Sequence, residues 1–346
     1  IIWLEKMKAV RIHEHGDIDV LKWEEVSIPS ILKNQVLVEI KAAAMNHLDL
    51  WVRKGIPGVP LPCILGSDGS GTVKEIGSKV TSFKTEDEVL IQPLTYCREC
   101  RFCESGQENY CESWGIYGEN QNGTQCEFIA VDEDHLRSKP HHLSFEEAAG
   151  FPLVAQTAYT MLVRRAKIKQ GETVFIWGAG SGVGSIAIQI AKEKGCLVIA
   201  AGGSEEKLNL AQELGADKVL NYKIVDVIEE VNRFTDGSGV DVIFEHVGAK
   251  TWNTSLKILG KGGRLVTCGA TTGAHVGIDI RHLFYKQQSI MGSTMGDVAA
   301  FDEVIQLLEE KKIRPVIDKV FPMKNIRDAH VYLKESHQAG KVILVP

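Results

Sequence analysis

Apolar and polar positions follow two different patterns along the chain, and the change between them comes near Phe151. Before that residue, short apolar runs are separated by turns rich in glycine and proline, which is typical of β-strands. We predict strands at residues 7–12, 36–40, 69–73, 88–91 and 127–131. The first part of the chain is therefore expected to be rich in short strands.

After Phe151, strand-like and helix-like segments alternate. Helical stretches lie at 184–194, 205–214 and 226–234. Between and beyond them are continuous apolar runs, typical of strands buried on both faces, at 173–177, 196–201, 218–220, 240–244 and 264–268. This alternation predicts an α/β fold with a doubly wound parallel sheet that is covered by helices on both faces.

The end of the chain is expected to return to the first region through a helix at 301–311, a strand near Val320 and a last strand at 340–345. Because 346 residues exceed what one hydrophobic core usually holds, we expect two domains. A strand-rich domain would comprise residues 1–152 and 297–346, and an α/β domain would comprise residues 153–296.

Composition and charge exclude several classes of function. The chain is 44% hydrophobic and 24% charged, which is ordinary for a globular protein. Its net charge of −6 comes from well-mixed acidic and basic residues, which offer no basic surface to nucleic acid or to a membrane. No apolar run is long enough to span a bilayer, and the eight cysteines do not follow a secreted disulfide framework. We expect a cytoplasmic protein that acts on a small molecule.

A glycine-rich turn, Gly178 to Gly184, joins the apolar run 173–177 to the next helix. Glycines let the backbone approach a pyrophosphate, and the helix N-terminus supplies free N–H groups and a positive dipole end. A strict G-x-G-x-x-G does not fit, but a relaxed variant in a strand–turn–helix context predicts a dinucleotide site. The alternative is a tight turn without a ligand. The candidate cofactor-binding residues here are Ala179, Gly180, Ser181, Gly182, Val183 and Gly184.

The end of the second predicted strand favours NADP over NAD. NAD-binding folds usually place an acidic residue there to hold the ribose 2′-hydroxyl, and this chain has Gly202. Glycine leaves room for a 2′-phosphate, which Ser204 and Lys207 could bind. In the alternative interpretation, Ser204 only caps the following helix, and NAD is the cofactor.

Four cysteines, Cys97, Cys100, Cys103 and Cys111, are the most specific signal in the chain. Close cysteines on one loop provide the four soft ligands of a tetrahedral zinc site. An iron–sulfur cluster is the alternative, but the bacterial run has a tighter final spacing and a following proline, both missing here. Because all four ligands come from the protein, we predict one structural zinc per chain, in a lobe at about residues 93–115.

The order of these features resembles the medium-chain dehydrogenase/reductase superfamily, and the resemblance runs from Met7 to Pro346. Further matching stretches lie at 66–71, 80–84, 214–217, 221–222 and 340–342. The resemblance implies a GroES-like catalytic domain, a Rossmann domain that binds NAD(P), and a homodimer or homotetramer. It also implies further cofactor contacts at Tyr222, Val247, Gly269, Ala270 and Lys341.

The chain departs from this family at the catalytic zinc. Zinc alcohol dehydrogenases have a cysteine where this chain has Asn46, and a histidine where it has Ser67, before Asp68. The domain junction reads Gly150-Phe151-Pro152 and offers no third ligand. Asn46 with Asp49 instead resembles the quinone oxidoreductase and enoyl reductase branch, which usually lacks the cysteine lobe.

Losing this zinc would change the chemistry. An alcohol must approach alkoxide character before it gives up hydride, and zinc supplies that by lowering its pKa, whereas an activated double bond needs only donors for the developing enolate. We therefore expect an NADPH-dependent reductase of activated alkenes, quinones or aldehydes, acting in a cleft between the domains. The catalytic candidates are Asn46, His47, Ser67 and Asp68.

Alternatives to this interpretation stay open. Asn46 would then only hold the nicotinamide ribose, and His47 would be a surface residue or, with Asp68, part of a rebuilt metal site. At the level of function, the alternatives are an alcohol dehydrogenase and a non-catalytic protein that binds the cofactor.

Overall fold

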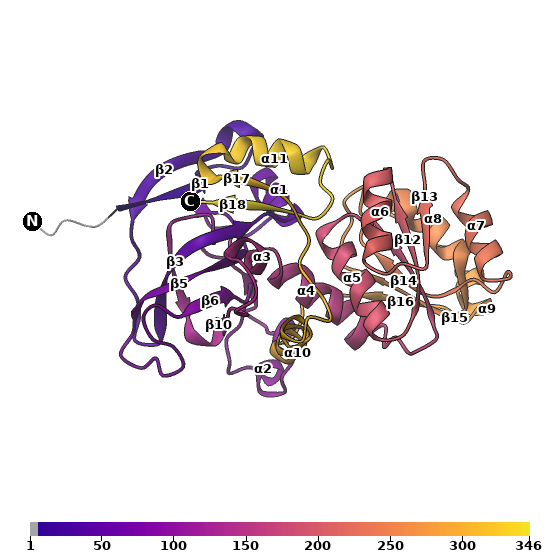
Figure 1. Ribbon diagram of the computed structural model, residues 1–346, viewed down its shortest axis with the longest axis horizontal. Coiled ribbons are helices and arrows are strands. Elements are labelled where there is room, and N and C mark those ends of the chain that lie inside the picture. Colours follow the sequence, from indigo (N-terminus) through magenta and orange to yellow (C-terminus); the bar gives the residue numbers. More distant parts are fainter. Residues whose placement is uncertain (1–5) are drawn as a thin grey trace, which may run out of the picture. The chain divides into compact units, whose positions relative to one another are not determined.

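The computed structural model describes residues 6–346, which fold into two compact units (Figure 1). Unit 1 contains the residues up to Leu153 together with Pro315–Pro346, and unit 2 is Val154–Arg314. Residues 1–5 of the expected first domain lie outside the described residues. The predicted fold class, an α/β domain with a parallel sheet beside a separate strand-rich domain, is confirmed.

The chain returns from unit 2 to unit 1 at residue 315, later than the expected boundary at 297. Helix α10 (Val298–Glu309) therefore belongs to unit 2. Its Glu303 Oε1 accepts a hydrogen bond from Arg164 Nη2 at 2.7 Å, and the backbone of Arg314 exchanges two hydrogen bonds with the Gln189 side chain. The boundary differs from the expected one because helical periodicity shows that a helix has an apolar face but not which core that face packs against.

Unit 2 is built on a six-stranded parallel sheet in the order β13-β12-β11-β14-β15-β16. The strands are β11 (Thr173–Trp177), β12 (Leu197–Gly202), β13 (Lys218–Asn221), β14 (Val240–Glu245), β15 (Leu259–Thr267) and β16 (Ser289–Gly292). The strand order reverses between β11 and β14. Sheets of this kind bind dinucleotides beyond the carboxyl ends of the strands at such a switch point.

Helices cover both faces of this sheet. Figure 1 shows α5 (Gly182–Glu193) and α6 (Glu205–Glu213) on one side of it, and α7 (Val227–Phe234) and α8 (Ala249–Ile258) on the other. The remaining helical segments are α4 (Pro152–Tyr159), the π-helix η4 (Thr160–Arg165) and α9 (Ile280–Tyr285). Phe175, Ile243 and Leu265 are fully buried in the core, as the continuous apolar runs predicted.

Unit 1 contains a seven-stranded sheet with the path β10-β6-β5-β3-β18-β17, in which β9 also pairs with β3. Its strands are β3 (Gln35–Ala44), β5 (Asp68–Ile76), β6 (Glu88–Ile91), β9 (Phe128–Asp132), β10 (Leu136–Ser138), β17 (Ile317–Pro322) and β18 (Lys341–Val345). Smaller sheets are formed by β1 (Lys6–Ile12), β2 (Lys22–Ser27) and β4 (Cys63–Ile64), and by β7 (Leu94–Thr95) and β8 (Gly115–Ile116). The C-terminal strands thus complete the sheet that the N-terminal part begins.

Short helices connect these strands. They are η1 (Ile18–Val20), α1 (His47–Lys54), α2 (Arg101–Glu104), η2 (Glu108–Tyr110), η3 (Glu133–His135), α3 (Phe145–Ala149), η5 (Met323–Asn325) and α11 (Ile326–Lys334). Across the described residues 6–346, every helix is too short or too polar to cross a membrane.

The register of the large sheet brings three strand ends together. Ala44, the last residue of β3, pairs with Asp68 of β5 and with Ile343 of β18. The Met45 N–H also donates to the Val342 carbonyl at 2.9 Å. The residue after β3, the first residue of β5 and the first residue of β18 therefore meet at one place.

Candidate functional site

Three side chains at these strand ends form a buried group, which we call the polar cluster: Asn46, Asp68 and Lys341. The Lys341 ammonium donates to Asn46 Oδ1 at 2.6 Å and to Asp68 Oδ2 at 2.9 Å. Asn46 Nδ2 donates to the same Asp68 oxygen at 2.9 Å, which closes the ring. Each residue is less than a tenth exposed (Asn46 7%, Asp68 0%, Lys341 3%). Charges buried this deeply persist because they are paired and hydrogen-bonded.

The second oxygen of Asp68 connects the cluster to the junction stretch. Asp68 Oδ1 accepts the backbone N–H of Leu153 at 2.8 Å, and Leu153 directly follows Pro152. Asn46, Asp68 and the backbone of Leu153 therefore meet, although they are far apart in the sequence. The backbone contact of Leu153 had no signal in the sequence, because any residue provides an N–H.

The buried carboxylate of Asp49 holds the backbone of Asn46 in place. Its Oδ2 accepts the backbone N–H of Asn46 at 2.7 Å, and its Oδ1 accepts from Gln125 Nε2 at 3.1 Å. Burial raises the pKa of Asp49 to about 7, and the charge of Asp68 raises it further, while backbone N–H donors and Lys341 oppose the shift. Asp49 thereby fixes the first turn of α1, which carries Asn46 as its cap.

The two other catalytic candidates are neighbours of the cluster in sequence. His47 is the first residue of α1 and is partly buried, with its ring centroid 6.5 Å from that of Trp51. Ser67 is only 1% exposed. Direct contact in this group is therefore established for Asn46 and Asp68, and Lys341 is the residue that connects them.

In unit 2, the glycine-rich turn has the shape of a phosphate cradle. Ser181 caps α5, and its Oγ accepts the Gly184 N–H at 3.0 Å. Gly178 has a positive φ of 62°, and a Cβ on Gly184 would collide with the Gly178 carbonyl oxygen. The turn can close only with glycine at these positions. A strand–turn–helix of this kind presents a helix N-terminus, which is a typical site for an anion.

Side chains gather where β12 and β13 end. A Cβ on Gly180 would collide with the Lys207 stem, and a Cβ on Gly203 would collide with the Tyr222 hydroxyl. Ser204 is the N-cap residue of α6, but within the described residues its side chain makes no capping hydrogen bond. Lys223, which the sequence did not single out, is also here, with its Cε 3.2 Å from the position of a Gly203 Cβ.

The carboxyl ends of β14 and β15 also meet, as the candidates Val247, Gly269 and Ala270 require. A Cβ on Gly248 would lie 3.0 Å from Ala270 Cα, and the Thr272 N–H donates to the Val247 carbonyl at 2.8 Å. Lys341, the remaining cofactor candidate, belongs to unit 1 and makes the contacts described for the polar cluster.

Sequence analysis missed two residues at this edge, Glu245 and His246. Glu245 is fully buried, and its Oε1 accepts the Val247 N–H at 2.7 Å. His246 Nε2 donates to the Trp177 carbonyl at 2.9 Å, and burial lowers the pKa of His246. A polar pair directly after a buried strand was the available signal.

The four cysteines converge in unit 1, in what we call the cysteine lobe. Their sulfur atoms all lie within 4.8 Å of one another, and in the described part of the chain this is the one such group of His, Cys, Asp or Glu side chains. Backbone N–H groups point at the sulfurs, as in Cys100 N to Cys97 Sγ at 3.3 Å. Backbone hydrogen bonds lower the pKa of Cys100 to about 6, whereas burial raises that of Cys103 to about 12. Thiolates this close repel one another without a cation, so the donor set fits Zn²⁺.

Arg98, inside the first Cys-x-x-Cys turn, connects the lobe to the rest of unit 1. Its Nη2 donates to Asp132 Oδ2 and its Nε to Asp134 Oδ2, both at 2.8 Å. Arg98 holds a positive φ of 72°, which directs the turn toward these carboxylates.

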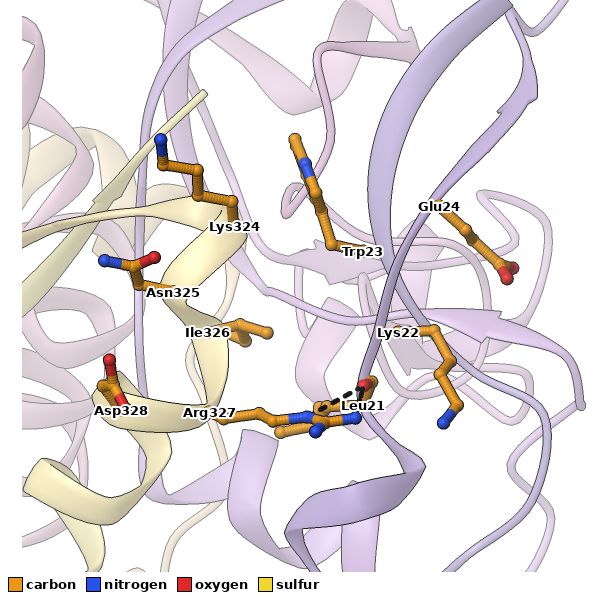
Figure 2. A pocket seen from close by; sticks show the side chains of 9 residues that line it. All are labelled: Leu21, Lys22, Trp23, Glu24, Lys324, Asn325, Ile326, Arg327 and Asp328. Carbon is orange, nitrogen blue, oxygen red and sulfur yellow. Dashed lines mark hydrogen bonds between the residues drawn. The ribbon is translucent and has the colours of Figure 1, made fainter.

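A surface pocket in unit 1 lies away from these groups (Figure 2). It runs between the start of β2 and the start of α11, where Arg327 donates to the Leu21 carbonyl. Its lining is Leu21, Lys22, Trp23, Glu24, Lys324, Asn325, Ile326, Arg327 and Asp328. The lining mixes both signs of charge and contains none of the predicted site residues.

Known proteins are similar to this chain over nearly its whole length. The family profile of the alcohol dehydrogenase GroES-like domain matches residues 32–141, and that of zinc-binding dehydrogenase matches residues 182–310. An NAD-dependent alcohol dehydrogenase of Sulfolobus acidocaldarius is 35% identical, over 98% of this chain and 99% of the relative. A crotonyl-CoA carboxylase/reductase of Cereibacter sphaeroides is 31% identical, over 97% of this chain and 86% of the relative.

Among solved structures, a crystal structure of an NAD-dependent alcohol dehydrogenase superposes with a TM-score of 0.96. It is 41% identical and covers 98% of this chain and 100% of its own. The two kinds of relative differ in chemistry, since one name describes an alcohol dehydrogenase and the other a reductase.

Proposed function

This chain belongs to the medium-chain dehydrogenase/reductase superfamily and is an NAD(P)-dependent oxidoreductase, and we propose that it is an NADPH-dependent reductase of activated alkenes, quinones or aldehydes. We further propose that it works without a catalytic metal. The observation that carries this proposal is the polar cluster, which contains Asn46 and Asp68. Asn46 and Ser67 are two of the positions at which the family resemblance predicts zinc ligands, and they carry an amide and a hydroxyl. The junction stretch Gly150-Phe151-Pro152 offers no third ligand, and the Leu153 N–H that follows it donates to Asp68.

The cluster does not fit the ligand set of a catalytic zinc, which binds through cysteine, histidine or carboxylate. Asp68 is the one carboxylate among these residues, and both of its oxygens already accept hydrogen bonds. Without a Lewis acid, alcohol oxidation is disfavoured because the alcohol keeps its high pKa. Reduction of a polarised double bond needs only a donor for the oxygen that becomes negative.

NADPH, when bound, supplies the hydride for this reduction. The β-carbon of an enone or enoyl thioester accepts that hydride, the carbonyl oxygen takes up the negative charge, and the α-carbon then takes a proton from solvent water. Asn46 is the group of this chain that we propose as the donor to that oxygen, because its amide N–H groups keep their donor character at any pH. Asp49 and Lys341 would hold the amide in place.

Three observations support NADPH as the cofactor. Gly202 ends β12 without an acid that would repel a 2′-phosphate. Lys207 and Tyr222 lie against the two adjacent turns, and the Ser204 side chain is not used to cap α6. The glycine cradle before α5 would receive the pyrophosphate.

The test is an acceptor screen that follows the loss of NADPH absorbance with enones, enoyl thioesters, quinones and aldehydes. We expect turnover with at least one of these classes, and no dependence on added zinc. If simple alcohols are oxidised, and more rapidly with added zinc, the alcohol dehydrogenase alternative replaces this proposal. That alternative is favoured by the names of the alcohol dehydrogenase relatives. If NADPH binds but no acceptor oxidises it, the chain is a cofactor-binding protein.

We further propose that the cysteine lobe binds one structural zinc, that the protein is cytoplasmic, and that it forms a homodimer or homotetramer. All eight cysteines are free of disulfides, which supports a reducing compartment. Helix α9 exposes Ile280 by 67%, Phe284 by 68% and Tyr285 by 77%. Apolar side chains gathered on one surface are typical of a contact with another chain.

A further inference from the structure

We infer that the ammonium of Lys341 takes the place of the catalytic metal and acts by holding and polarising the Asn46 amide. Lys341 is thus a positioning residue, because it acts through Asn46 and not on the substrate. This inference rests on the proposed function, since it names the positive charge that the reduction would use.

The hydrogen-bond partners allow the Asn46 amide one orientation only. A lysine ammonium can only donate hydrogen bonds, and a carboxylate can only accept them. Asn46 Oδ1 must therefore face Lys341 at 2.6 Å, and Nδ2 must face Asp68 at 2.9 Å. A flipped amide would place its NH₂ group against the ammonium and its oxygen against the carboxylate. Both contacts would be repulsive, so the ion pair fixes the amide.

The same contacts make Asn46 a stronger donor. When the ammonium donates to the amide oxygen, it withdraws electron density from the nitrogen, and hydrogen bonds linked in this way strengthen one another. Nδ2 carries two hydrogens, and the bond to Asp68 uses one. The second is the hydrogen we assign to the substrate oxygen.

The position of the ammonium also excludes a metal. A divalent ion bound to Asn46 Oδ1 would lie about 2.0–2.2 Å from that oxygen. The ammonium already lies 2.6 Å from the same oxygen, in a site where Asp68 is 0% exposed. Two cations this close in a buried site repel strongly. One carboxylate can balance the lysine, but the cluster has no second one to balance a metal as well.

The experiment must separate a role of Lys341 in the reaction from a role in folding, because Lys341→Met alone leaves Asp68 buried and unpaired. The double variant Lys341→Met/Asp68→Asn removes both charges and keeps the shapes. Lys319→Met is the matched control, since Lys319 is an exposed lysine on the neighbouring strand β17. The readouts are kcat and KM for the acceptor, the Kd of NADPH, the melting temperature and the zinc content.

We expect Lys341→Met to lower the melting temperature and the double variant to recover it. We expect kcat to stay about 10–100-fold below wild type in both, which is less than the roughly 100–1,000-fold for the loss of an oxyanion donor itself, because Asn46 is still present. The Kd of NADPH should change less than about threefold. Lys341→Arg should recover part of kcat. Lys319→Met should leave kcat, KM, the Kd of NADPH and the zinc content unchanged, and should lower the melting temperature only slightly because it removes contacts with the Phe321 and Tyr332 rings. Wild-type protein equilibrated with excess zinc and then dialysed should hold one zinc per chain.

Several results would overturn the inference. In one, the double variant recovers kcat together with stability, which makes Lys341 a folding residue only. In another, Lys341→Met weakens NADPH binding more than about tenfold at unchanged kcat, which makes it a cofactor ligand. A second zinc in the wild type would overturn it as well. Failure of the proposed function gives another result, in which the wild type reduces no acceptor. The zinc content and the melting temperatures then still test whether Lys341 excludes a metal and pairs with Asp68.

Discussion

The cysteine lobe and the polar cluster lie in the same unit, and each gathers several polar side chains in a small volume. In the lobe, the four side chains that meet are all cysteines, with sulfur atoms within 4.8 Å of one another. Their thiolates need a cation from solution. In the polar cluster, one of the three side chains is itself a cation, Lys341. Two sites in one unit can therefore differ in where their positive charge comes from: the lobe fits a metal ion, and the polar cluster contains the ammonium of Lys341.

The largest effect should come from breaking the lobe. Replacing Cys97 or Cys111 by serine removes a zinc ligand, and loss of a structural metal ranks with the most destabilising substitutions, above about 4 kcal/mol. Thermal unfolding and zinc content would measure this, and the Kd of NADPH should stay near its wild-type value. Cys268→Ser, outside the lobe, is the control. If the cysteine variants keep both their zinc and their melting temperature, the lobe is not a zinc site.

Asp49, which holds Asn46 of the polar cluster in place, should make the stability of the protein depend on pH. The folded-state pKa of Asp49 is about 7, above the value of about 3.9 in an unfolded chain. The folded state therefore binds more protons between these values, and the stability from the protonated carboxyl is fully present below about pH 4 and lost as the pH rises to about 7.

This proton linkage predicts a slope of up to about 1.4 kcal/mol per pH unit in the free energy of unfolding. Asp49→Asn should flatten the slope in urea titrations between pH 4 and 7. The Gln125 amide can turn to donate or accept as needed, because its Oε1 has no partner within the described residues. An unchanged slope in the variant would show that Asp49 is ionised throughout.

Lys207 is a third cation, and we propose that it binds the cofactor's 2′-phosphate. If it neutralises the 2′-phosphate, Lys207→Ala should weaken NADPH binding about tenfold, or about 1.4 kcal/mol, and leave NADH binding unchanged. Fluorescence titration with both nucleotides measures this difference. Equal losses for the two nucleotides, or a wild-type preference for NADH, would contradict the assignment of NADP.

The smallest effect concerns how the lobe is attached. Arg98 is 38% exposed and pairs with Asp132 and Asp134, so solvent weakens these ion pairs. We expect Arg98→Ala to lower the free energy of unfolding by about 0.5–1 kcal/mol without loss of zinc. If Arg98→Ala also loses its zinc, the ion pairs of Arg98 are needed to keep the metal site intact.

The sequence by itself determined the features that depend on neighbouring residues. Alternating apolar segments predicted the parallel sheet of unit 2, because a strand buried on both faces needs a continuous apolar run. The glycine turn before α5 and the cysteines between 97 and 111 were recognisable because each site forms from one short stretch of chain. The identities of Asn46 and Ser67 are likewise read from the sequence alone, and the loss of a catalytic zinc that they indicate stays a prediction.

Only the tertiary structure decided which distant residues meet. Helix α10 belongs to unit 2 because its apolar face packs against the core of that unit. Helical periodicity predicts the apolar face but not the core that it contacts. Lys341 lies 273 positions from Asp68 and 295 from Asn46, and the register of β18 beside β3 and β5 brings the three together. The residues next to Lys341 in the sequence do not indicate which side chains its ammonium will contact. The charge of the polar cluster therefore follows from strand pairing, which is a property of the whole sheet.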